Sequence, residues 1–318
     1  MRIASVGPML RASIAALALV GWASPARAQL NTQHVKGTFG LKGGSQAPPG
    51  GYVVAPLLYF YSTDTIRNRD GDRFPVSANI DAALFGTGYA HITTKKILGG
   101  NYGFSVLLAG ANNRIQGTEI DQNPGAGITD SVVQPISIGW NLKRADAQVQ
   151  YTLYVPTGRY TDGAANNTGL GMWGQEVMAG VTGYLTEDRK YHAATAVSFN
   201  FQSKKEDSEM KVGNAMNLEG GIGGDFLKGG LTVGLDYYAS FKLTDDEIQG
   251  LPPIFVPGKN RVFAIGPEVT LTLARKNTVY GFLNVKYFWE TYARTSTQGG
   301  AFFLSATFLT KPLHIPPP

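Results

Sequence analysis

The residues of this chain that could do chemistry are charged side chains set at alternate positions of otherwise apolar segments. The set is Asp81, Glu219, Asp225, Asp236, Lys242, Glu268, Lys286 and Glu290, with Lys143. Because side chains alternate across a strand, each charge would share one face while apolar residues take the other. Charges gathered on one side of a sheet could pair and stiffen it, or could line a polar path that selects solutes. Both interpretations remain open from the sequence alone.

No group of residues predicts catalysis, a bound metal or a cofactor. The histidines are too scattered to match the ligand spacing of a metal site, and they are His34, His91, His192 and His314. His192 and Ser198 are the best candidates for a base and a nucleophile. They lie six positions apart on one strand face, which is roughly 20 Å at about 3.3 Å per residue. They are therefore too far apart to form a hydrogen-bonded pair.

The segments that contain these charges are predicted to be long amphipathic strands. In residues 231–242, the apolar side chains from Leu231 to Phe241 alternate with a polar set from Thr232 to Lys242. In a soluble sandwich the apolar face would meet a second sheet. In a membrane barrel it would meet lipid, and the polar face would meet a watery lumen. Because a charge facing lipid at mid-depth costs roughly 2–4 kcal/mol, a barrel explains why the charges keep to one face.

Connections of alternating length join these strands and favour the membrane barrel. We predict about twelve strands, near residues 51–61, 77–92, 100–111, 131–143, 146–156, 172–186, 191–202, 212–226, 230–243, 260–274, 278–290 and 300–309. Short turns follow the even strands, and longer loops rich in Pro, Gly, Asn and acids follow the odd ones. An antiparallel transmembrane β-barrel over residues 51–309, with short periplasmic turns and long outer loops, has this pattern.

The N-terminus predicts export. Residues 1–28 combine a basic start, an uncharged apolar stretch and an Ala-Arg-Ala cleavage site, as a signal peptide does. The alternative of a membrane anchor is disfavoured, because about a dozen apolar residues are too few to span a bilayer. The chain has no cysteine, and removing Arg2, Arg11 and Arg27 lowers its net charge from +5 to +2. This small charge does not predict nucleic-acid binding.

The segments before the first strand and after the last strand allow further predictions. Residues 29–50 are a poor strand and contain a Pro-Pro-Gly-Gly run, so they could fold inward as a lumen plug. Gly221 and Gly223, on the predicted lumen face, would leave room for it. The last strand, ending near Phe308, could act as an assembly signal or be an ordinary strand. Residues 310–318 are expected to form a Pro-rich tail.

Several motifs in a fixed order resemble one known family. They include His34-x-x-Gly37, Pro48-Pro49-Gly50-x-Tyr52, Pro156-x-Gly158, Gly171-x-Trp173 and Gly266-Pro267. From about residue 34 to 308 the chain resembles the outer-membrane barrel family named for the meta-pathway of phenol degradation. That resemblance implies a transporter associated with the catabolism of aromatic or hydrophobic compounds, and it carries over no catalytic residues.

The sequence therefore predicts an outer-membrane channel for passive uptake of small hydrophobic or aromatic compounds. Its expected partners are outer-membrane lipid, the barrel assembly machinery and the solute, and it is expected to be a monomer. Two alternatives stay open. One is a structural or adhesive barrel whose outer loops bind a partner, and the other is a surface enzyme that modifies lipids.

Overall fold

The protein forms a closed antiparallel β-barrel, seen here in a computed structural model that describes residues 31–75, 78–117, 121–247 and 259–314. Twelve long strands make the wall. They are β1 (Gly50–Thr63), β3 (Ala78–Ile97), β4 (Gly100–Gly117), β7 (Ser131–Asn141), β8 (Ala145–Val155), β9 (Gly174–Tyr184), β10 (Tyr191–Gln202), β11 (Ala215–Phe226), β12 (Leu231–Lys242), β13 (Arg261–Arg275), β14 (Thr278–Arg294) and β16 (Gly300–His314).

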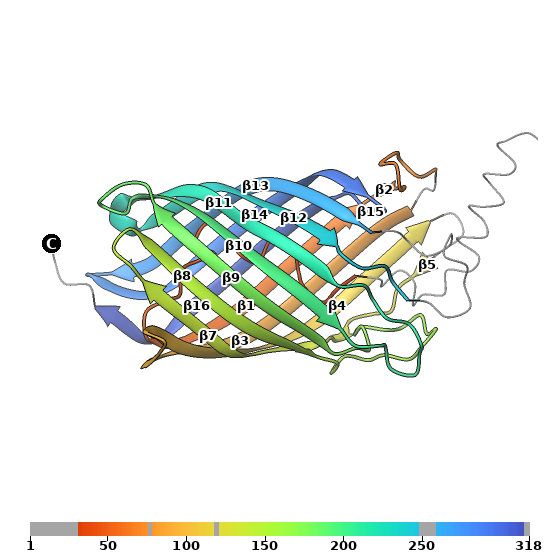
Figure 1. Cartoon of the computed structure of the whole chain (residues 1–318), viewed down its shortest axis with the longest axis horizontal. Coiled ribbons are helices and arrows are strands. Elements are labelled where there is room, and N and C mark those ends of the chain that lie inside the picture. Colours follow the sequence, from red (N-terminus) through yellow and green to blue (C-terminus); the bar gives the residue numbers. More distant parts are fainter. Residues whose placement is uncertain (1–30, 76–77, 118–120, 248–258, 315–318) are drawn as a thin grey trace, which may run out of the picture.

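Each wall strand pairs with its neighbours in sequence, and the first strand closes the ring. β1 pairs with β16 on one edge and with β3 on the other, and β3 in turn pairs with β4. Figure 1 shows the strands running side by side around the barrel. Closure leaves no long unpaired strand edge, which is the condition for a sheet to sit in lipid.

Short turns connect the strands at one end of the barrel, and long loops connect them at the other. The shortest connections are residues 98–99 and 276–277, and a 3₁₀ turn, η2 (Leu227–Gly229), joins β11 to β12. The long connections carry four two-residue strands, namely β2 (Ile66–Arg67), β5 (Asp121–Gln122), β6 (Gly127–Ile128) and β15 (Ser296–Thr297). The structure confirms that short turns gather at one end and long loops at the other, and we refer to these ends as periplasmic and outer because outer-membrane barrels have that orientation.

Alternation along the strands sets which side chains face lipid. In β12, Leu235 is 53% exposed on the outer surface, while the adjacent Asp236 is 1% exposed. The same opposition separates Trp289 from Phe288 and Glu290 in β14. Apolar residues therefore cover the lipid-facing surface, and the charges of the central wall point into the barrel.

Several strands extend beyond their predicted ends. β3 continues to Ile97, β4 to Gly117, β14 to Arg294 and β16 to His314. The pairing of neighbours holds them together where the apolar alternation has already stopped, as Ile97 with Gly100 and Thr278 with His314 illustrate. The segment predicted to begin a Pro-rich tail is thus strand as far as His314. Residues 1–28, the predicted signal peptide, and residues 315–318 lie outside the described residues.

Pro135 interrupts the wall. It has no N–H to donate, and the register of β7 shifts there against both β4 and β8. The hydroxyl of Tyr102 on β4 donates to the Pro135 carbonyl oxygen over 2.8 Å. An unsatisfied carbonyl is costly at membrane depth, so Tyr102 stabilises this break in the sheet.

Helices contribute little to the fold. Among the residues that the structure describes, no helix is long and apolar enough to cross a membrane.

Candidate functional site

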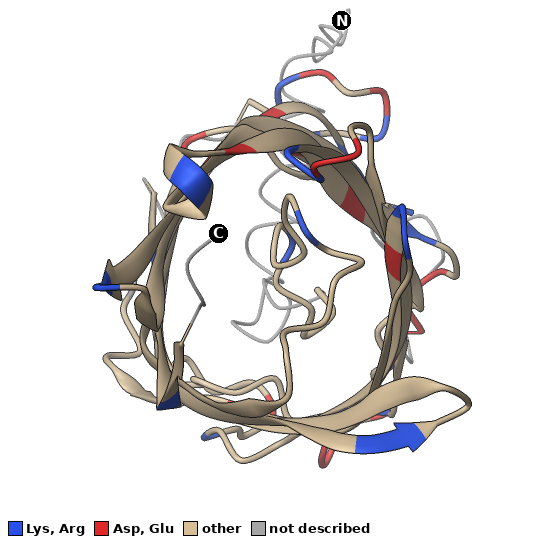
Figure 2. Ribbon diagram, turned by 90° about the vertical axis from the view of Figure 1, so that its left-hand side faces the viewer, with Lys and Arg blue, Asp and Glu red and all other residues tan. Residues whose placement is uncertain are grey.

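A stretch of chain before the first strand lies inside the barrel. We call residues 31–49 the lumen segment. Figure 2 looks into the barrel from the short-turn end and shows chain within the ring of strands. At its start, the Gln33 side chain donates to the Met172 carbonyl beside the outer end of β9, over 2.6 Å. From there the segment runs to the periplasmic end, where it enters β1 at Gly50.

His34 anchors the segment between two glutamates of the wall. Its Nδ1 lies 2.7 Å from Glu176 Oε2 on β9, and its Nε2 lies 2.9 Å from Glu219 Oε1 on β11. Burial alone would lower the pKa of His34, but the two carboxylates outweigh burial and raise that pKa to about 10. The imidazole is therefore a cation at neutral pH and pairs with both acids.

Glu219 also binds the backbone of the segment. Its Oε1 accepts the N–H of Gly37 over 2.8 Å and its Oε2 accepts the N–H of Phe39 over 2.9 Å. The side chain is fully buried. A buried carboxylate with three donors is well satisfied, so this one wall residue fixes both the histidine and the turn that follows it.

A niche of wall glycines holds Leu41. A Cβ added to Gly221, Gly223 or Gly234 would lie 2.8, 3.0 or 2.6 Å from the Leu41 methyl groups. Gly221 and Gly223 are the glycines that the sequence predicts to leave room for an inward segment. Any side chain at these positions would displace Leu41, which is 1% exposed.

A buried charge cluster lies beside this niche. Glu268 accepts the Leu41 N–H over 2.9 Å, and Lys286 Nζ lies 3.3 Å from Glu268 and 3.6 Å from Asp236. Lys286 also donates to the Gly37 carbonyl over 3.4 Å. The predicted lumen charges therefore do pair with one another, and they use the lumen segment as a further partner.

The periplasmic end of the segment is held by separate contacts. Lys42 Nζ lies 2.8 Å from Asp225 Oδ2, and the Ser45 hydroxyl donates to Asp146 over 2.8 Å. Between them, the Gly44 N–H donates to the Thr182 hydroxyl over 3.1 Å. The lumen segment is thus attached to the wall along its whole length.

An aromatic surface faces the first part of the segment. Its members are the lumen-facing side chains Tyr59, Tyr61, Tyr238, Phe288 and Phe303. Val35 packs against this cluster, and a Cβ added to Gly37 would lie 2.6 Å from the Phe288 ring. Glu290 accepts hydrogen bonds from two of the tyrosine hydroxyls, at 2.8 and 3.0 Å. We call this set the aromatic patch.

The predicted charges do not all lie in one place. Glu219, Asp236, Glu268, Lys286 and Glu290 lie together around the lumen segment, and Asp225 joins them at its periplasmic end. Lys242 is buried but pairs with Asp246 at the outer rim, at 2.6 Å.

Two residues predicted to face the lumen do not. Asp81 is exposed on the same face of β3 as Phe85 and accepts a hydrogen bond from Ser62. It lies near the outer end of its strand, where a charge facing outward costs little. Lys143 lies exposed in the turn after β7, which ends at Asn141.

The sequence reasoning missed the most central contacts, those of Glu176 and His34. Glu176 binds His34, Tyr154 and Asn200 within a buried network. The residues on the same face of β9 include Met178 and glycine. The alternation of apolar and polar residues along this strand therefore did not predict that this face is polar. His192 and Ser198 share no contact, since Ser198 accepts from Asn217 and His192 packs on Tyr184.

The described residues contain no cluster of three or more His, Cys, Asp or Glu side chains able to hold a metal ion. The arrangement is therefore a polar and aromatic lumen with a chain segment bound inside it.

Comparison with known proteins agrees with this architecture. The family described as "Putative MetA-pathway of phenol degradation" matches residues 63–306. The COG4313 outer membrane channel from Pseudomonas putida F1 has a similar structure, with TM-score 0.70, 13% identity, and 87% of this chain and 100% of that chain covered. The transport unit of the autotransporter AIDA-I from Escherichia coli gives TM-score 0.50 at 8% identity, covering 92% of this chain and 99% of that one. No curated protein matches the sequence.

Proposed function

The chain belongs to the phenol-degradation MetA-pathway family, and from this premise we propose that its channel-like outer-membrane barrel takes up small aromatic compounds passively. The lumen segment is proposed to act as a plug that must shift before solute passes. The barrel wall supplies the path, and a concentration gradient supplies the driving force.

The aromatic patch is the observation that carries the proposal. Five aromatic side chains from β1, β12, β14 and β16 face the lumen beside the Glu290 carboxylate. Aromatic rings bind one another in offset or edge-to-face geometry, and a phenol hydroxyl can donate to a carboxylate. We therefore expect this surface to favour aromatic solutes over more polar ones such as sugars.

The position of the segment supports the plug role. Val35 packs against the patch and Gly37 lies against the Phe288 ring, so this stretch stands between those rings and an incoming solute. The ties that hold the segment are ionic and hydrogen-bonded rather than covalent. Such ties can break and re-form, so they allow gating on the timescales of loop motion.

Planar-bilayer recording of a variant lacking residues 31–47 tests both parts of the proposal. We expect its single-channel conductance to exceed that of the intact chain, and we expect added phenol to reduce the open-channel current. Glucose at the same concentration is the control and should have a smaller effect. Folding of the variant is checked by its heat-modifiable mobility on a gel.

Unchanged conductance after the deletion would remove the plug from the proposal. Equal responses to phenol and glucose would remove the preference for aromatic solutes. A barrel that never conducts, with or without the segment, would instead favour the structural or adhesive alternative, because only a channel changes flux.

A further inference from the structure

The periplasmic rim of the barrel is strongly basic. Across the short turns, the strand ends beside them and the end of β16 there are ten basic residues. The acids there are Glu187 and Asp188 in a turn, and Asp146 and Asp225 on the lumen side of the strand ends. The basic residues are Lys95, Lys96, Lys143, Arg144, Arg189, Lys190, Lys228, Arg275, Lys276 and Lys311. Figure 2 shows Lys and Arg spaced around this rim rather than gathered on one side.

Exposed leucines accompany the basic residues around the rim. Leu98, Leu142, Leu185, Leu227 and Leu313 are 44–86% exposed. A leucine that meets acyl chains next to a lysine that reaches the head-group layer is the arrangement by which side chains settle at a membrane interface. An acidic protein partner would require the basic residues alone, and it gives no reason for a leucine in turn after turn.

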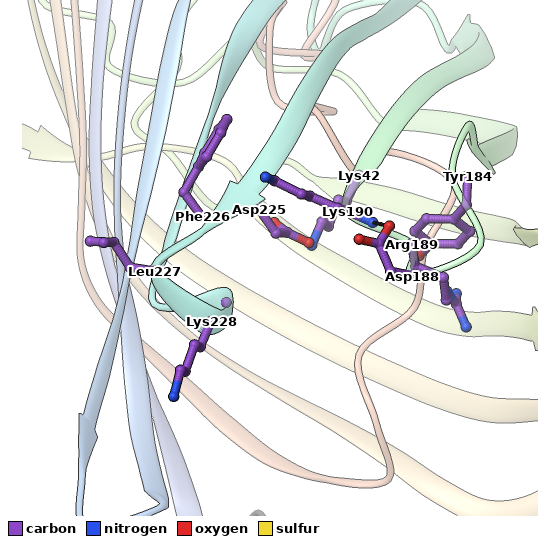
Figure 3. A pocket seen from close by; sticks show the side chains of 10 residues that line it. Lys42, Tyr184, Asp188, Arg189, Lys190, Asp225, Phe226, Leu227 and Lys228 are labelled. Carbon is purple, nitrogen blue, oxygen red and sulfur yellow. Dashed lines mark hydrogen bonds and ion pairs between the residues drawn. The ribbon is translucent and has the colours of Figure 1, made fainter. Parts of the chain in front are cut away.

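One part of the rim forms a cavity. Between the turn at residues 185–190 and the turn η2, a space of about 580 Å³ is lined by Lys190, Phe226, Leu227 and Lys228, among others. Figure 3 shows Phe226 and Lys190 on one side of the η2 turn, and Leu227 and Lys228 directed away from them. The cavity therefore joins cationic groups to apolar ones at the edge of the membrane.

The cations in this cavity differ in what they already bind. Lys42 is paired with Asp225, as Figure 3 shows, and Arg189 is paired with Asp146. Lys190 has no carboxylate within ion-pair distance among the described residues, and neither does Lys228. Lys190 instead lies 5.1 and 5.2 Å from the ring centres of Tyr191 and Phe226.

The acids of the cavity are occupied as well. Asp225 binds Lys42 and the Thr232 hydroxyl, and Asp188 accepts from the Thr186 hydroxyl and the Lys190 backbone N–H. Lys190 and Lys228 thus remain available to an incoming anion. Tyr191 and Phe226 lie on the lipid-facing side of their strands, since the lumen-facing neighbours are His192 and Asp225.

We propose that this cavity is a binding site for the head group of an anionic phospholipid of the inner leaflet of the outer membrane. Lys190, which lies above the Phe226 ring, contacts the phosphate, and Lys228 adds its charge from the other side of the η2 turn. Phe226 and Leu227 contact the start of the acyl chains. The remaining basic rim residues hold further head groups less tightly. This site lies at the periplasmic mouth of the barrel, where Lys42 and Asp225 also line it, and it does not depend on the nature of the solute.

Native mass spectrometry of the full barrel in detergent tests the site. Phosphatidylglycerol and phosphatidylethanolamine are added at equal concentration to the wild type and to the double variant K190Q/K228Q. Each lysine near an anionic lipid surface contributes about fivefold in affinity. We therefore expect the double variant to bind phosphatidylglycerol roughly 25-fold more weakly. Phosphatidylethanolamine binding should change little.

Two controls fix the interpretation. The variant R69Q/R73Q removes the same charge from an outer loop and should bind phosphatidylglycerol like the wild type, and K190R/K228R should keep binding. Heat-modifiable gel mobility shows that each barrel is folded. Equal binding of both lipids to the wild type, or undiminished phosphatidylglycerol binding to K190Q/K228Q, overturns the proposal. Displacement of the lipid by millimolar inorganic phosphate also overturns it, because an anion site without lipid contacts would behave in that way.

Discussion

Replacing Glu219 by glutamine should release the lumen segment from the wall. The carboxylate accepts from His34, Gly37 and Phe39 at 2.8–2.9 Å in a fully buried position. Glutamine keeps one acceptor oxygen and replaces the other by an NH₂ group, which cannot accept from a donor. At least one of the three hydrogen bonds is therefore lost, whichever oxygen is replaced. Hydrogen bonds to charged groups are worth about 1.5–3 kcal/mol each.

The loss should come to roughly 3–6 kcal/mol, because the weakened pairing with the His34 cation adds to the lost backbone contact. At about 1.4 kcal/mol per tenfold, the equilibrium between bound and released segment shifts by about two to four orders of magnitude. A gate that is almost always closed in the wild type would then be open for a measurable fraction of the time.

Single-channel recording of E219Q measures this fraction directly. The matched control is D246N, which alters a buried carboxylate that accepts from Gly213 and Lys242 at the outer rim and touches no residue of the lumen segment. We expect frequent openings in E219Q and wild-type behaviour in D246N. If both variants, correctly folded, keep the conductance of the wild type, the reasoning about Glu219 is refuted.

Three further changes should have separate signatures. Burial lowers the pKa of His34, but its carboxylate neighbours raise that pKa to about 10. Its ion pairs are therefore fully formed below its ordinary pKa near 6.5, and they are lost as pH rises through about 10. Channel opening should increase over that range, and this increase should vanish in H34Q. The substitution L41A empties the glycine niche and should weaken docking of the segment by about 2–5 kcal/mol, seen as faster proteolysis of the segment in folded barrels. The substitution Y102F leaves the Pro135 carbonyl without its donor and should lower the unfolding free energy by about 1–3 kcal/mol, measured by urea unfolding in lipid vesicles, with no change in conductance.

The barrel could be predicted because lipid imposes a simple rule on each strand. Leu235 outward and Asp236 inward follow from alternation alone, and the ends of β10 at Tyr191 and Gln202 coincide with those predicted. Where the strand leaves the membrane, the rule no longer applies. For that reason the sequence underestimated β3 and β16, and it placed Asp81 on the wrong face.

The lumen contacts were only partly predictable. Gly221 and Gly223 marked space for a guest segment because glycine on a lumen face leaves a gap. The wall residues that bind this segment have no comparable pattern in the sequence. His34 and Glu176 are 142 positions apart in the chain, and only closure of the barrel brings them within 2.7 Å. A lone histidine and a lone glutamate have no spacing that reveals such a pairing.

The basic rim was visible in the sequence but could not be interpreted there. Pairs such as Lys95-Lys96 and Arg275-Lys276 stand in or beside short turns, where charged residues are ordinary. Their meaning depends on all the turns lying at one end of the barrel, with exposed leucines beside them. Only the folded barrel brings the turns together, so the sequence of a single turn does not reveal the basic rim.

Locking the lumen segment in place tests the central claim most directly. A Cβ on Gly43 would lie 3.7 Å from the Cβ of Ala196 on β10, close to the separation of about 3.8 Å in a disulfide. The chain has no other cysteine, so G43C/A196C can form one defined bond. We predict that the oxidised variant carries no solute flux in proteoliposomes and that a reducing agent restores flux to the wild-type level. Equal flux in the oxidised and reduced states, with the disulfide shown to be formed, would contradict a lumen segment that gates the channel.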